Sequence, residues 1–316
     1  MSGQKTVLVT GCSDGGIGAA LAAEFARRGC RVFATARNLD KIETLTKEQH
    51  STGTITPLQL DVTSESSIAT CVAAVSEALS SSPAEGVETG EGQAEGGGLD
   101  ILINNAGINH FKPFADDSIA KLRSVIDTNV IGVFAVTHAF LPLLIQAASK
   151  NGKNKGRAGR GSVVATVGSV NEVYFPPFQV AYNASKAAVH AMANTLRTEL
   201  SPFGVQFVTL VTGAVSTELF KNSPTTLPEN SIYAPLKEDI EGRAVLKSAT
   251  FVTPEEYARQ VAGQLLRDKP RRSIWAGGMA TISWFLSWIG WEGMLVSLCN
   301  VHYPLALRFV IRDYKS

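Results

Sequence analysis

Short runs of apolar and β-branched residues alternate along the chain with longer stretches in which apolar residues recur at helical spacing. Seven of these runs predict strands, with the bounds Thr6 to Thr10, Arg31 to Thr35, Thr56 to Leu60, Ile101 to Asn104, Ser162 to Val167, Val205 to Val211 and Ser273 to Ala276. Continuous apolar strands separated by helices are typical of a parallel sheet covered on both faces. The pattern therefore predicts an α/β fold with one doubly wound, nucleotide-binding domain and a seven-stranded parallel sheet.

This domain is expected to occupy residues 1–276, followed by an apolar C-terminal extension, 277–316. Two low-complexity stretches, 80–98 and 150–161, lie just before strands, where insertions are tolerated because the backbone is already solvated. The second contains five Lys or Arg residues. We interpret it as a solvated basic loop, with contact to anionic lipid or phosphate as the alternative. Residues 216–248 combine Pro, Phe, Tyr and Leu and are expected to form a substrate loop that closes over a partly apolar ligand.

The extension contains three tryptophans, Trp284, Trp288 and Trp291. A membrane-spanning helix needs roughly 20 uninterrupted apolar residues, and Glu292 with repeated glycines interrupts this run. Three interpretations stay open: an interfacial helix that contacts lipid, a cover over an apolar pocket, or a contact between two copies. We expect no secretory signal and a cytoplasmic protein, which in the lipid interpretation is peripheral at a lipid droplet or endoplasmic reticulum membrane.

Charge and cysteine content narrow the function classes. There are 29 Lys and Arg residues and 28 Asp and Glu residues, a formal net charge of +1. This balance indicates no nucleic-acid partner and no strongly acidic partner. The four cysteines are scattered without the spacing of a metal site: Cys12, Cys30, Cys71 and Cys299. We therefore predict reduced thiols, no bound metal and a small-molecule enzyme.

A glycine-rich segment, GCSDGGIG from Gly11 to Gly18, joins the first strand to the first helix. Glycines permit a sharp turn and a close approach to a pyrophosphate, and the following helix offers free N–H groups and the positive end of its dipole. Flanked in this way, the segment predicts dinucleotide binding. The residues expected to contact the cofactor are Gly11, Ser13, Asp14, Gly16, Ile17 and Gly18.

The same segment also contains GxSxG, which occurs at the nucleophile turn of serine hydrolases. A hydrolase that uses Ser13 would need a histidine and an acid at the same edge of the sheet, and His110, His138 and His190 stand in no motif of their own. A serine hydrolase is therefore the alternative enzyme class. A nucleotide-binding scaffold without catalysis is the alternative outside the enzymes.

The end of the second strand favours NADP(H). An acidic side chain there would bind the ribose hydroxyls of NAD and repel the extra phosphate of NADP. Here Thr35 and Ala36 are followed by Arg37, whose guanidinium can pair with the 2′-phosphate, with help from the Ser13 hydroxyl. Asp40 is the competing acidic residue, but its place before KIETLTKE is better explained by helix N-capping.

Tyr182 and Lys186 stand four residues apart in YNASK, at the start of a helical pattern, so they share one face of a helix. A tyrosine hydroxyl has an ordinary pKa near ~10 and gives up its proton reluctantly at neutral pH. A nearby cation such as Lys186 would favour the phenolate. Taken alone, however, this spacing also fits a packed aromatic beside a solvated lysine.

Several segments in order resemble the short-chain dehydrogenase/reductases. They are TG and GGIG between Thr10 and Gly18, NNAG at Asn104 to Gly107, Asn129 in DTNVIGVF, Ser169 lying 13 residues before Tyr182, and YxxxK. The resemblance spans most of the chain and implies a Rossmann-type fold and a carbonyl reductase or alcohol dehydrogenase. It also implies a homo-oligomer formed through the helices that contain Asn129 and Tyr182.

The family's mechanism, carried onto these positions, implies that Ser169 hydrogen-bonds the substrate carbonyl and Tyr182 transfers the proton. Lys186 would bind the nicotinamide ribose and tune the tyrosine, and Asn129 would hold a water in a proton relay. The other cofactor contacts implied by the resemblance are Tyr182 itself, Asp61 beside the adenine, Val62, Asn105, Ala106, Gly107, Gly213, Val215 and Thr217.

Three features depart from the family's pattern. The glycine-rich loop TGCSDGGIG is one residue longer than the usual TGxxxGxG, so the assignment of individual glycines to the turn or to the phosphate contact stays open by one position. Thr212 and Gly213 replace the usual Pro-Gly after the sixth strand, and Gly168 stands where a second serine often precedes Ser169, a change that we expect to matter little. The segments TVLVTGCSDGGIG, FATAR and VTGAVST resemble a fungal branch that includes NADPH-dependent 1-acyldihydroxyacetone phosphate reductases and ketoreductases of secondary metabolism. We therefore predict NADPH-dependent reduction of a ketone on a hydrophobic or lipid-like small molecule. A polyketide-type ketoreductase and an alcohol dehydrogenase are the alternatives within the family.

Overall fold

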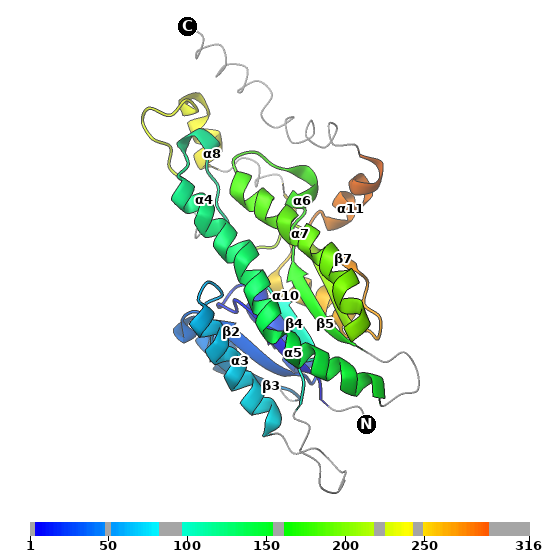
Figure 1. Cartoon of the computed structure of the whole chain (residues 1–316). Coiled ribbons are helices and arrows are strands. Elements are labelled where there is room, and N and C mark those ends of the chain that lie inside the picture. Colours follow the sequence, from blue (N-terminus) through cyan, green and yellow to red (C-terminus); the bar gives the residue numbers. More distant parts are fainter. Residues whose placement is uncertain are drawn as a thin grey trace, which may run out of the picture.

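The computed structural model describes residues 4–47, 52–81, 97–153, 161–217, 225–242 and 249–290. Its centre is one parallel sheet in the order β3-β2-β1-β4-β5-β6-β7, with helices on both faces (Figure 1). The strands are β1 (Thr6–Val9), β2 (Arg31–Ala36), β3 (Thr54–Gln59), β4 (Ile101–Asn104), β5 (Ser162–Val167), β6 (Val205–Thr212) and β7 (Ser273–Ala276). The predicted α/β fold with a doubly wound, seven-stranded sheet is confirmed.

The strand bounds agree with the predicted ones to within one residue, except at the start of β3. We predicted a start at Thr56, but Thr54 already pairs with Arg31 of β2. The side chains of β3 are exposed or half-buried, so its first residues do not form an apolar run that a hydrophobicity pattern would detect. Because β3 is an edge strand, Pro57 is tolerated within it.

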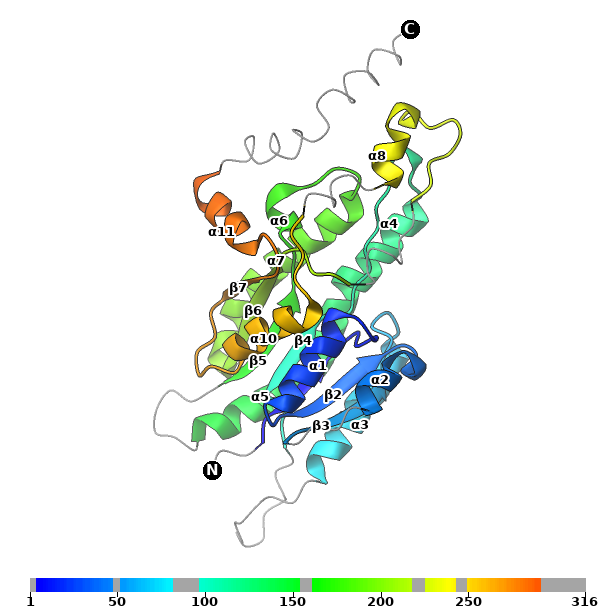
Figure 2. The same ribbon diagram turned by 180° about the vertical axis from the view of Figure 1, so that it is seen from behind.

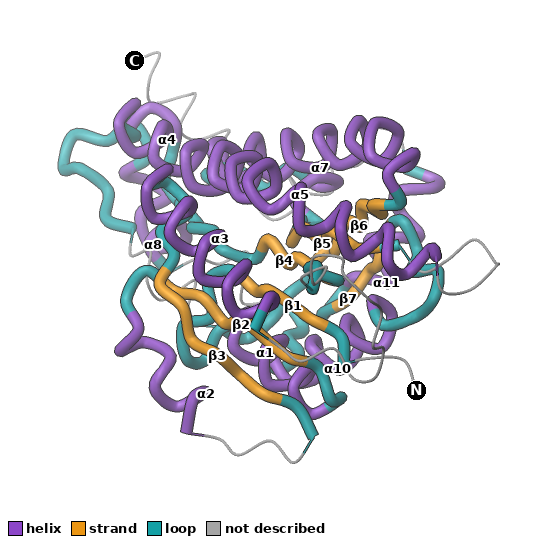
Figure 3. The backbone as a smooth tube through the Cα atoms, turned by 60° about the horizontal axis from the view of Figure 1, so that its bottom comes forward, coloured by secondary structure: helices purple, strands orange, loops and turns teal. Residues whose placement is uncertain are grey.

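Two layers of helices cover the sheet, one on each face (Figures 2 and 3). The long helices are α1 (Ile17–Arg27), α3 (Glu65–Ser80), α5 (Gly132–Lys153), α7 (Val180–Leu200) and α10 (Pro254–Leu265). The shorter elements are η1 (Leu39–Ile42), α2 (Glu43–Lys47), η2 (Phe114–Asp116), α4 (Ile119–Ile126), the π-helical turn η3 (Asp127–Ile131), α6 (Asn171–Tyr174), η4 (Ser201–Phe203), η5 (Ala234–Leu236), α8 (Lys237–Glu241) and α11 (Ala280–Ile289). In β1, Val7 and Val9 pack toward α1 and α10, whereas Leu8 packs toward α3, α5 and α7. This alternation is how one short strand anchors both layers.

α4, η3 and α5 run on from one another as a long apolar segment. Residues Ile119–Lys150 could cross a membrane by length and composition alone. However, Val136, Phe140 and Leu144 are fully buried in the cluster between α5 and the sheet. The core helix of a soluble protein passes the same test, so this segment is explained by its packing against the strands.

The carboxyl ends of the parallel strands meet at one edge of the sheet, where α4, α6, α8 and α11 gather (Figures 1 and 2). The described part of the predicted substrate loop, 225–242, packs near this edge. Its Leu227, Leu236 and Ile240 form a small apolar cluster with Phe111 from the segment after β4. Ligands of open α/β sheets bind at this edge. Most of the predicted insertions 80–98 and 150–161, and the extension beyond residue 290, lie outside the described residues.

Candidate active site

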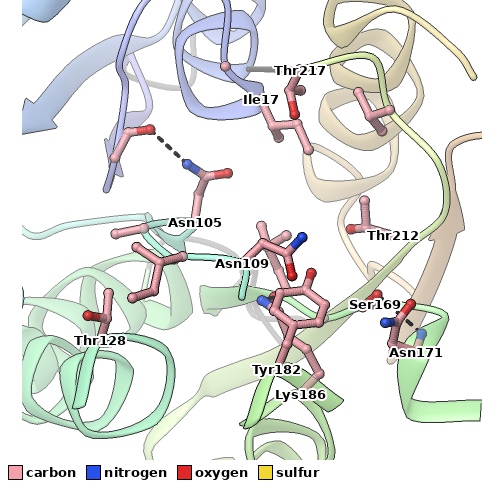
Figure 4. Close-up of a pocket in the computed structure, with 18 of the residues that line it drawn as sticks. Ile17, Asn105, Asn109, Thr128, Ser169, Asn171, Tyr182, Lys186, Thr212 and Thr217 are labelled. Atoms are coloured by element: carbon pink, nitrogen blue, oxygen red, sulfur yellow. Dashed lines mark hydrogen bonds between the residues drawn. The ribbon is translucent and has the colours of Figure 1, made fainter. Parts of the chain in front are cut away.

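A cavity of about 1430 Å³ opens at the carboxyl edge of the sheet. It reaches from the glycine-rich loop and the end of β2, past the ends of β4, β5 and β6, to α11. Figure 4 shows some of the residues that line it, among them Ile17, Asn105 and Tyr182. Its volume exceeds the roughly 300–1,000 Å³ of an ordinary small-ligand pocket, so it has room for a dinucleotide and a second molecule. The residues that we predicted as site residues all line this cavity, except Gly18 and Asn129. Their individual roles stay predictions.

The backbone of the glycine-rich loop turns at Gly11 and Gly15, whose φ angles are 71° and 72°. L side chains rarely adopt this left-handed region, so each turn favours glycine. A Cβ at Gly11 would also lie 2.8 Å from the Ala106 Cα. Gly16 then caps α1 without a side-chain hydrogen bond, and no acidic residue stands in the first turn. The first N–H groups of α1 therefore remain available to an anion in the cavity.

Gly18 acts one layer below the cavity wall. A Cβ there would lie 2.4 Å from the Gly11 carbonyl oxygen and 2.5 Å from Asn105 Nδ2. Asn105 Nδ2 donates to the carbonyls of Thr10, at 2.8 Å, and Gly11, at 2.9 Å (Figure 4). Gly18 thus permits the amide of Asn105 to fasten the loop to the end of β4. The structure gives Gly18 this packing role, and its predicted cofactor contact stays a prediction.

The end of β2 presents cations to the cavity. Arg37 and Asn38 line it directly after the strand, and Lys41 joins them from η1. Lys41 was missed by the sequence reasoning, although a second cation four residues after Arg37 was its signal. The predicted capping role of Asp40 is wrong: Asn38 is the N-cap, and its side chain accepts from the backbone N–H of Asp40 at 2.9 Å. Asp40 lies in the first turn of η1, where its negative charge interacts favourably with the positive end of the helix dipole.

Asp61, two residues after β3, lines the cavity together with Arg37. Its Oδ1 accepts hydrogen bonds from the Thr63 N–H at 2.9 Å and the Thr63 hydroxyl at 2.7 Å. Burial alone would raise the pKa of Asp61, but these bonds and the charge of Arg37 hold it below the ordinary value. The carboxylate is therefore ionised at neutral pH and can accept hydrogen bonds from an adenosine.

Ser169, Tyr182 and Lys186 meet at the middle of the cavity (Figure 4). Ser169 follows β5, and its hydroxyl accepts from the Asn171 N–H at 3.1 Å and lies beside the Tyr182 side chain. Lys186 lies one turn after Tyr182 on α7, as the spacing predicted. Its Nζ donates to the Val167 carbonyl at 2.7 Å and lies 5.5 Å from the centre of the Tyr182 ring. The three side chains therefore surround one point where a carbonyl oxygen can be placed.

The pKa values of this cluster follow mainly from burial. Burial raises the pKa of Tyr182, a hydrogen bond with Ser169 lowers it, and the charge of Glu172 raises it. Burial likewise lowers the pKa of Lys186 to about 8, against the opposing charge of Glu172. We expected the lysine to favour the phenolate. In the protein's own field burial dominates, and the tyrosine stays protonated as a proton donor requires.

Asn129 lies behind the cavity wall, on the π-helical turn, and is fully buried. Its Oδ1 accepts from the Ile108 N–H at 2.8 Å, and its Nδ2 donates to the Ile108 carbonyl at 2.9 Å and to the Ser185 hydroxyl at 3.0 Å. The side chain thus joins the segment after β4 to α7. The structure gives Asn129 this bracing position, and its predicted part in a proton relay stays a prediction.

The loop after β6 is held by two contacts that its sequence conceals. The Thr212 hydroxyl is hydrogen-bonded to the Tyr257 hydroxyl of α10 at 2.8 Å. A Cβ at Gly213 would lie 2.0 Å from the Gly278 carbonyl oxygen, so only glycine fits there. The departure from Pro-Gly is therefore compensated. Gly213, Val215 and Thr217 line the cavity, and their predicted cofactor contacts stay predictions.

Several cavity residues were not found from the sequence. The polar ones near Ser169 are Asn109, Asn171, Tyr174 and Gln179, and the apolar ones at the far end are Phe251, Met279, Ile282 and Leu286. The polar group could have been found from the sequence, because its members follow Asn104-Asn105 or stand between Ser169 and Tyr182, next to residues that we had predicted. The apolar group was not predicted because the C-terminal segment was interpreted mainly from its tryptophans, and its other apolar residues were not assigned to the cavity. The cavity thus joins a polar centre to an apolar wall.

Ser13 lines the cavity within the phosphate loop, but no histidine is among the described residues that line it. His110 Nε2 is paired with Asp117 at 2.8 Å, and His190 Nδ1 with Glu172 at 3.0 Å. The base that a Ser13 hydrolase needs is therefore missing from the described wall, and GxSxG here is part of a phosphate loop.

The donor set fits a phosphorylated dinucleotide. The backbone at Gly11 lies so close to Ala106 that no side chain fits there. The first N–H groups of α1 are not capped by a side chain. Arg37 and Lys41 supply positive charge beyond the end of β2. Lys186 can reach a nicotinamide ribose beside Tyr182. These are the contacts that a pyrophosphate, a ribose and a 2′-phosphate require.

Comparisons with known proteins agree with this geometry. Residues 5–228 match the family model for short chain dehydrogenases. The chain is 38% identical over 291 residues to a short-chain dehydrogenase/reductase of Pestalotiopsis microspora, covering 90% of this chain and 89% of that one. It is 34% identical to the NADPH-dependent 1-acyldihydroxyacetone phosphate reductase of Schizosaccharomyces pombe, covering 99% of this chain and 96% of that one.

Solved structures share the fold. A short-chain dehydrogenase from Streptomyces avermitilis superposes with a TM-score of 0.71 at 22% identity, covering 98% of both chains. One from Burkholderia cenocepacia in complex with NADP has a TM-score of 0.61 at 22% identity, covering 90% of this chain and 93% of that one. The chain therefore belongs to the short-chain dehydrogenase/reductase family, whose members are NAD(P)-dependent oxidoreductases.

Proposed function

We propose that this enzyme reduces a ketone on a hydrophobic, lipid-like substrate to the secondary alcohol, with NADPH as its cofactor. The observation that carries the proposal is the course of the cavity, from Arg37 and Lys41, past Tyr182, to the apolar wall formed by Ile282 and Leu286. The relative from Schizosaccharomyces pombe that is named for an NADPH-dependent reduction of a lipid ketone supports the same reading.

The residues at the centre supply the acid catalysis that a ketone reduction needs. NADPH, when bound, supplies the hydride. Negative charge then develops on the carbonyl oxygen, where the Ser169 and Tyr182 hydroxyls can donate hydrogen bonds. Tyr182 transfers its proton to that oxygen, and the Lys186 ammonium stabilises the tyrosinate that remains. With Ser169, Tyr182 and Lys186 together, a scaffold without catalysis is the weaker alternative.

Arg37 is proposed to select NADPH by pairing with the 2′-phosphate. Arg37→Ala should weaken NADPH binding by about 10- to 100-fold, because a charge-assisted contact contributes roughly 1.5–3 kcal/mol. NADH binding should change by less than about threefold. Titration of both nucleotides by protein fluorescence measures these constants. Arg123→Ala, which removes an exposed arginine on α4, is the control. Equal weakening of both nucleotides by Arg37→Ala would contradict the assignment.

The substrate class is tested by a screen for NADPH consumption with acyl ketones of increasing chain length and with polyketide-type ketones. We expect kcat/KM to rise with chain length, since Ile282 and Leu286 offer an apolar wall. A preference for compact polyketide-type ketones would favour the second candidate, a tailoring ketoreductase. Its support is the similarity to fungal relatives named only as short-chain dehydrogenases.

We further propose that α11 contacts a lipid surface, as expected for a peripheral enzyme at a lipid droplet or endoplasmic reticulum membrane. Trp288 is 76% exposed and Phe285 55% exposed, while Ile282 and Leu286 of the same helix line the cavity. A lipid surface would cover these exposed groups and bring an acyl substrate to the cavity.

The predicted homo-oligomer has separate support. Phe134 on α5 and Val180 on α7 are exposed, and a second copy that packs on these helices would cover them.

Sedimentation with phosphatidylcholine vesicles tests the lipid contact. The double variant Phe285→Glu with Trp288→Glu should reduce the vesicle-bound fraction by more than about fivefold, because two apolar side chains leave the interface and two charges enter it. Phe203→Glu is the control, since Phe203 is 54% exposed but precedes β6, at the opposite edge of the sheet. Unchanged vesicle binding would favour α11 as a cover over the apolar pocket. A dimer that only the double variant dissociates would favour α11 as a contact between two copies.

A further inference from the structure

A buried carboxylate lies behind the residues of the proposed reaction. Glu172 belongs to α6, three residues after Ser169, and its side chain is 6% exposed. Its Oε1 lies 3.0 Å from His190 Nδ1 on α7, and its Oε2 has no hydrogen-bond partner among the described residues. A buried carboxylate is costly unless it is paired, so its presence here needs an explanation.

The chain makes room for this carboxylate at Gly168, next to Ser169. A Cβ at Gly168 would lie 3.1 Å from Glu172 Oε2 and 3.2 Å from the Leu210 carbonyl oxygen. A second serine at this position would therefore crowd the carboxylate. The structure thus shows Gly168 in close contact with Glu172, and our expectation that this glycine matters little stays a prediction.

The carboxylate faces one stripe of α7. Tyr182, Lys186 and His190 follow each other at intervals of four residues, so they lie along the same face of the helix. The charged groups that interact with Glu172 are Lys186, His190 and, further along α7, Arg197. Lys186 Nζ is held at the Val167 carbonyl, directly before Gly168. The pair of Glu172 and His190 thus lies close to the place where Lys186 Nζ contacts the backbone before Gly168.

We propose that Glu172 is a positioning residue of the reaction, which acts through Lys186 and Tyr182 and is itself held by His190. The inference rests on the proposed reduction. A negative charge at this place keeps the lysine charged and the phenol protonated, which is the state that donates a proton to a ketone. The His190 side chain is 37% exposed, so the pair also joins the buried cluster to solvent.

The pKa directions agree with this geometry. Burial lowers the pKa of Lys186 to about 8, and the charge of Glu172 opposes the fall. Burial raises the pKa of Tyr182, and Glu172 raises it further, while the Glu172 carboxylate 3.0 Å from His190 Nδ1 raises the pKa of His190. Reduction needs both the Lys186 ammonium and the protonated Tyr182 phenol, so it is lost as the pH rises through the pKa of Lys186, about 8, and then through that of Tyr182. Removal of Glu172 should move that loss to lower pH.

The kinetic test uses the isosteric variant Glu172→Gln. The alkaline fall of kcat/KM for ketone reduction should move to lower pH by about one unit, the scale expected from a charged neighbour. Glu172→Asp, which retains the charge, should restore the wild-type profile. Glu24→Gln is the matched control, because Glu24 is a buried carboxylate paired with Arg27 and Arg28 on α1, remote from α7. A loss of activity without a shifted profile, or an equal shift in Glu24→Gln, would overturn the proposal.

A second measurement needs no turnover and separates this inference from the proposed function. In protein with ¹³C-labelled tyrosine and histidine, NMR titration follows Tyr182 and His190, assigned with Tyr182→Phe and His190→Gln. In Glu172→Gln both groups should titrate at lower pH than in the wild type. In His190→Gln, which keeps the carboxylate, Tyr182 should ionise at a pH no lower than in the wild type. An unmoved Tyr182 in folded Glu172→Gln, or a lowered one in His190→Gln, would overturn the proposal even if no ketone substrate is found.

Discussion

Tyr182→Phe should lower kcat for ketone reduction by about 10²- to 10⁴-fold, the range that a positioned general acid contributes. Only the hydroxyl is lost, and Tyr182 lines the cavity together with Ser169, where a substrate carbonyl is proposed to bind. The affinity for NADPH should change by less than about threefold, because the loop contacts at Gly11 and Arg37 are untouched. Initial rates of NADPH consumption and a fluorescence titration measure the two effects separately.

The matched control for this variant is Tyr257→Phe. Tyr257 is fully buried on α10, and its hydroxyl is bonded to Thr212. Its removal should lower the free energy of unfolding by about 1 kcal/mol, through the lost hydrogen bond, and change kcat by less than about tenfold. If Tyr182→Phe retained full reduction, or if both variants lost activity equally, a proton-donor role for Tyr182 would be untenable.

Much of the site could be predicted because its residues are set by local rules. The spacing of Tyr182 and Lys186 fixes them on one helical face, and a strand followed by glycines and a helix fixes the phosphate loop. These signals depend on neighbours in the sequence, so they are visible without a structure. The sheet followed from apolar strands for the same reason, and only the polar start of edge strand β3 was missed.

The residues that sequence reasoning missed depend on contacts between distant segments. Glu172 is a surface-like residue in the sequence and becomes buried only because Gly168 leaves space and His190 approaches from α7. Gly18 carries the same lesson. Its motif predicts a cofactor contact, but the close approach of the Gly11 carbonyl and the Asn105 amide, which also requires a glycine, is visible only in the structure. The N-cap was assigned to Asp40 instead of Asn38 for a related reason. Both residue types suit an N-cap, and only the path of the backbone decides between them.

Gly18→Ala should both destabilise the protein and weaken cofactor binding. The new Cβ would meet the Gly11 carbonyl oxygen and Asn105 Nδ2 at 2.4 and 2.5 Å, and neither atom can move without breaking the bonds between Asn105 and the loop. Overpacking of this kind costs about 1–3 kcal/mol in the free energy of unfolding. Because relief of the clash displaces the phosphate loop, the Kd for NADPH should rise by at least about tenfold.

Urea denaturation and NADPH titration measure both effects, and Gly263→Ala provides the comparison. Gly263 lies within α10, where the nearest atom to a new Cβ is Arg28 Nη1 at 3.5 Å, an ordinary contact with a flexible side chain. Alanine is the better helix former, so this variant should gain about 0.5–1 kcal/mol and bind NADPH as the wild type does. A Gly18→Ala protein as stable as the wild type and with unchanged NADPH affinity would show that the loop can shift away from β4 at no cost. The close packing of Gly18 would then have no part in forming the phosphate site.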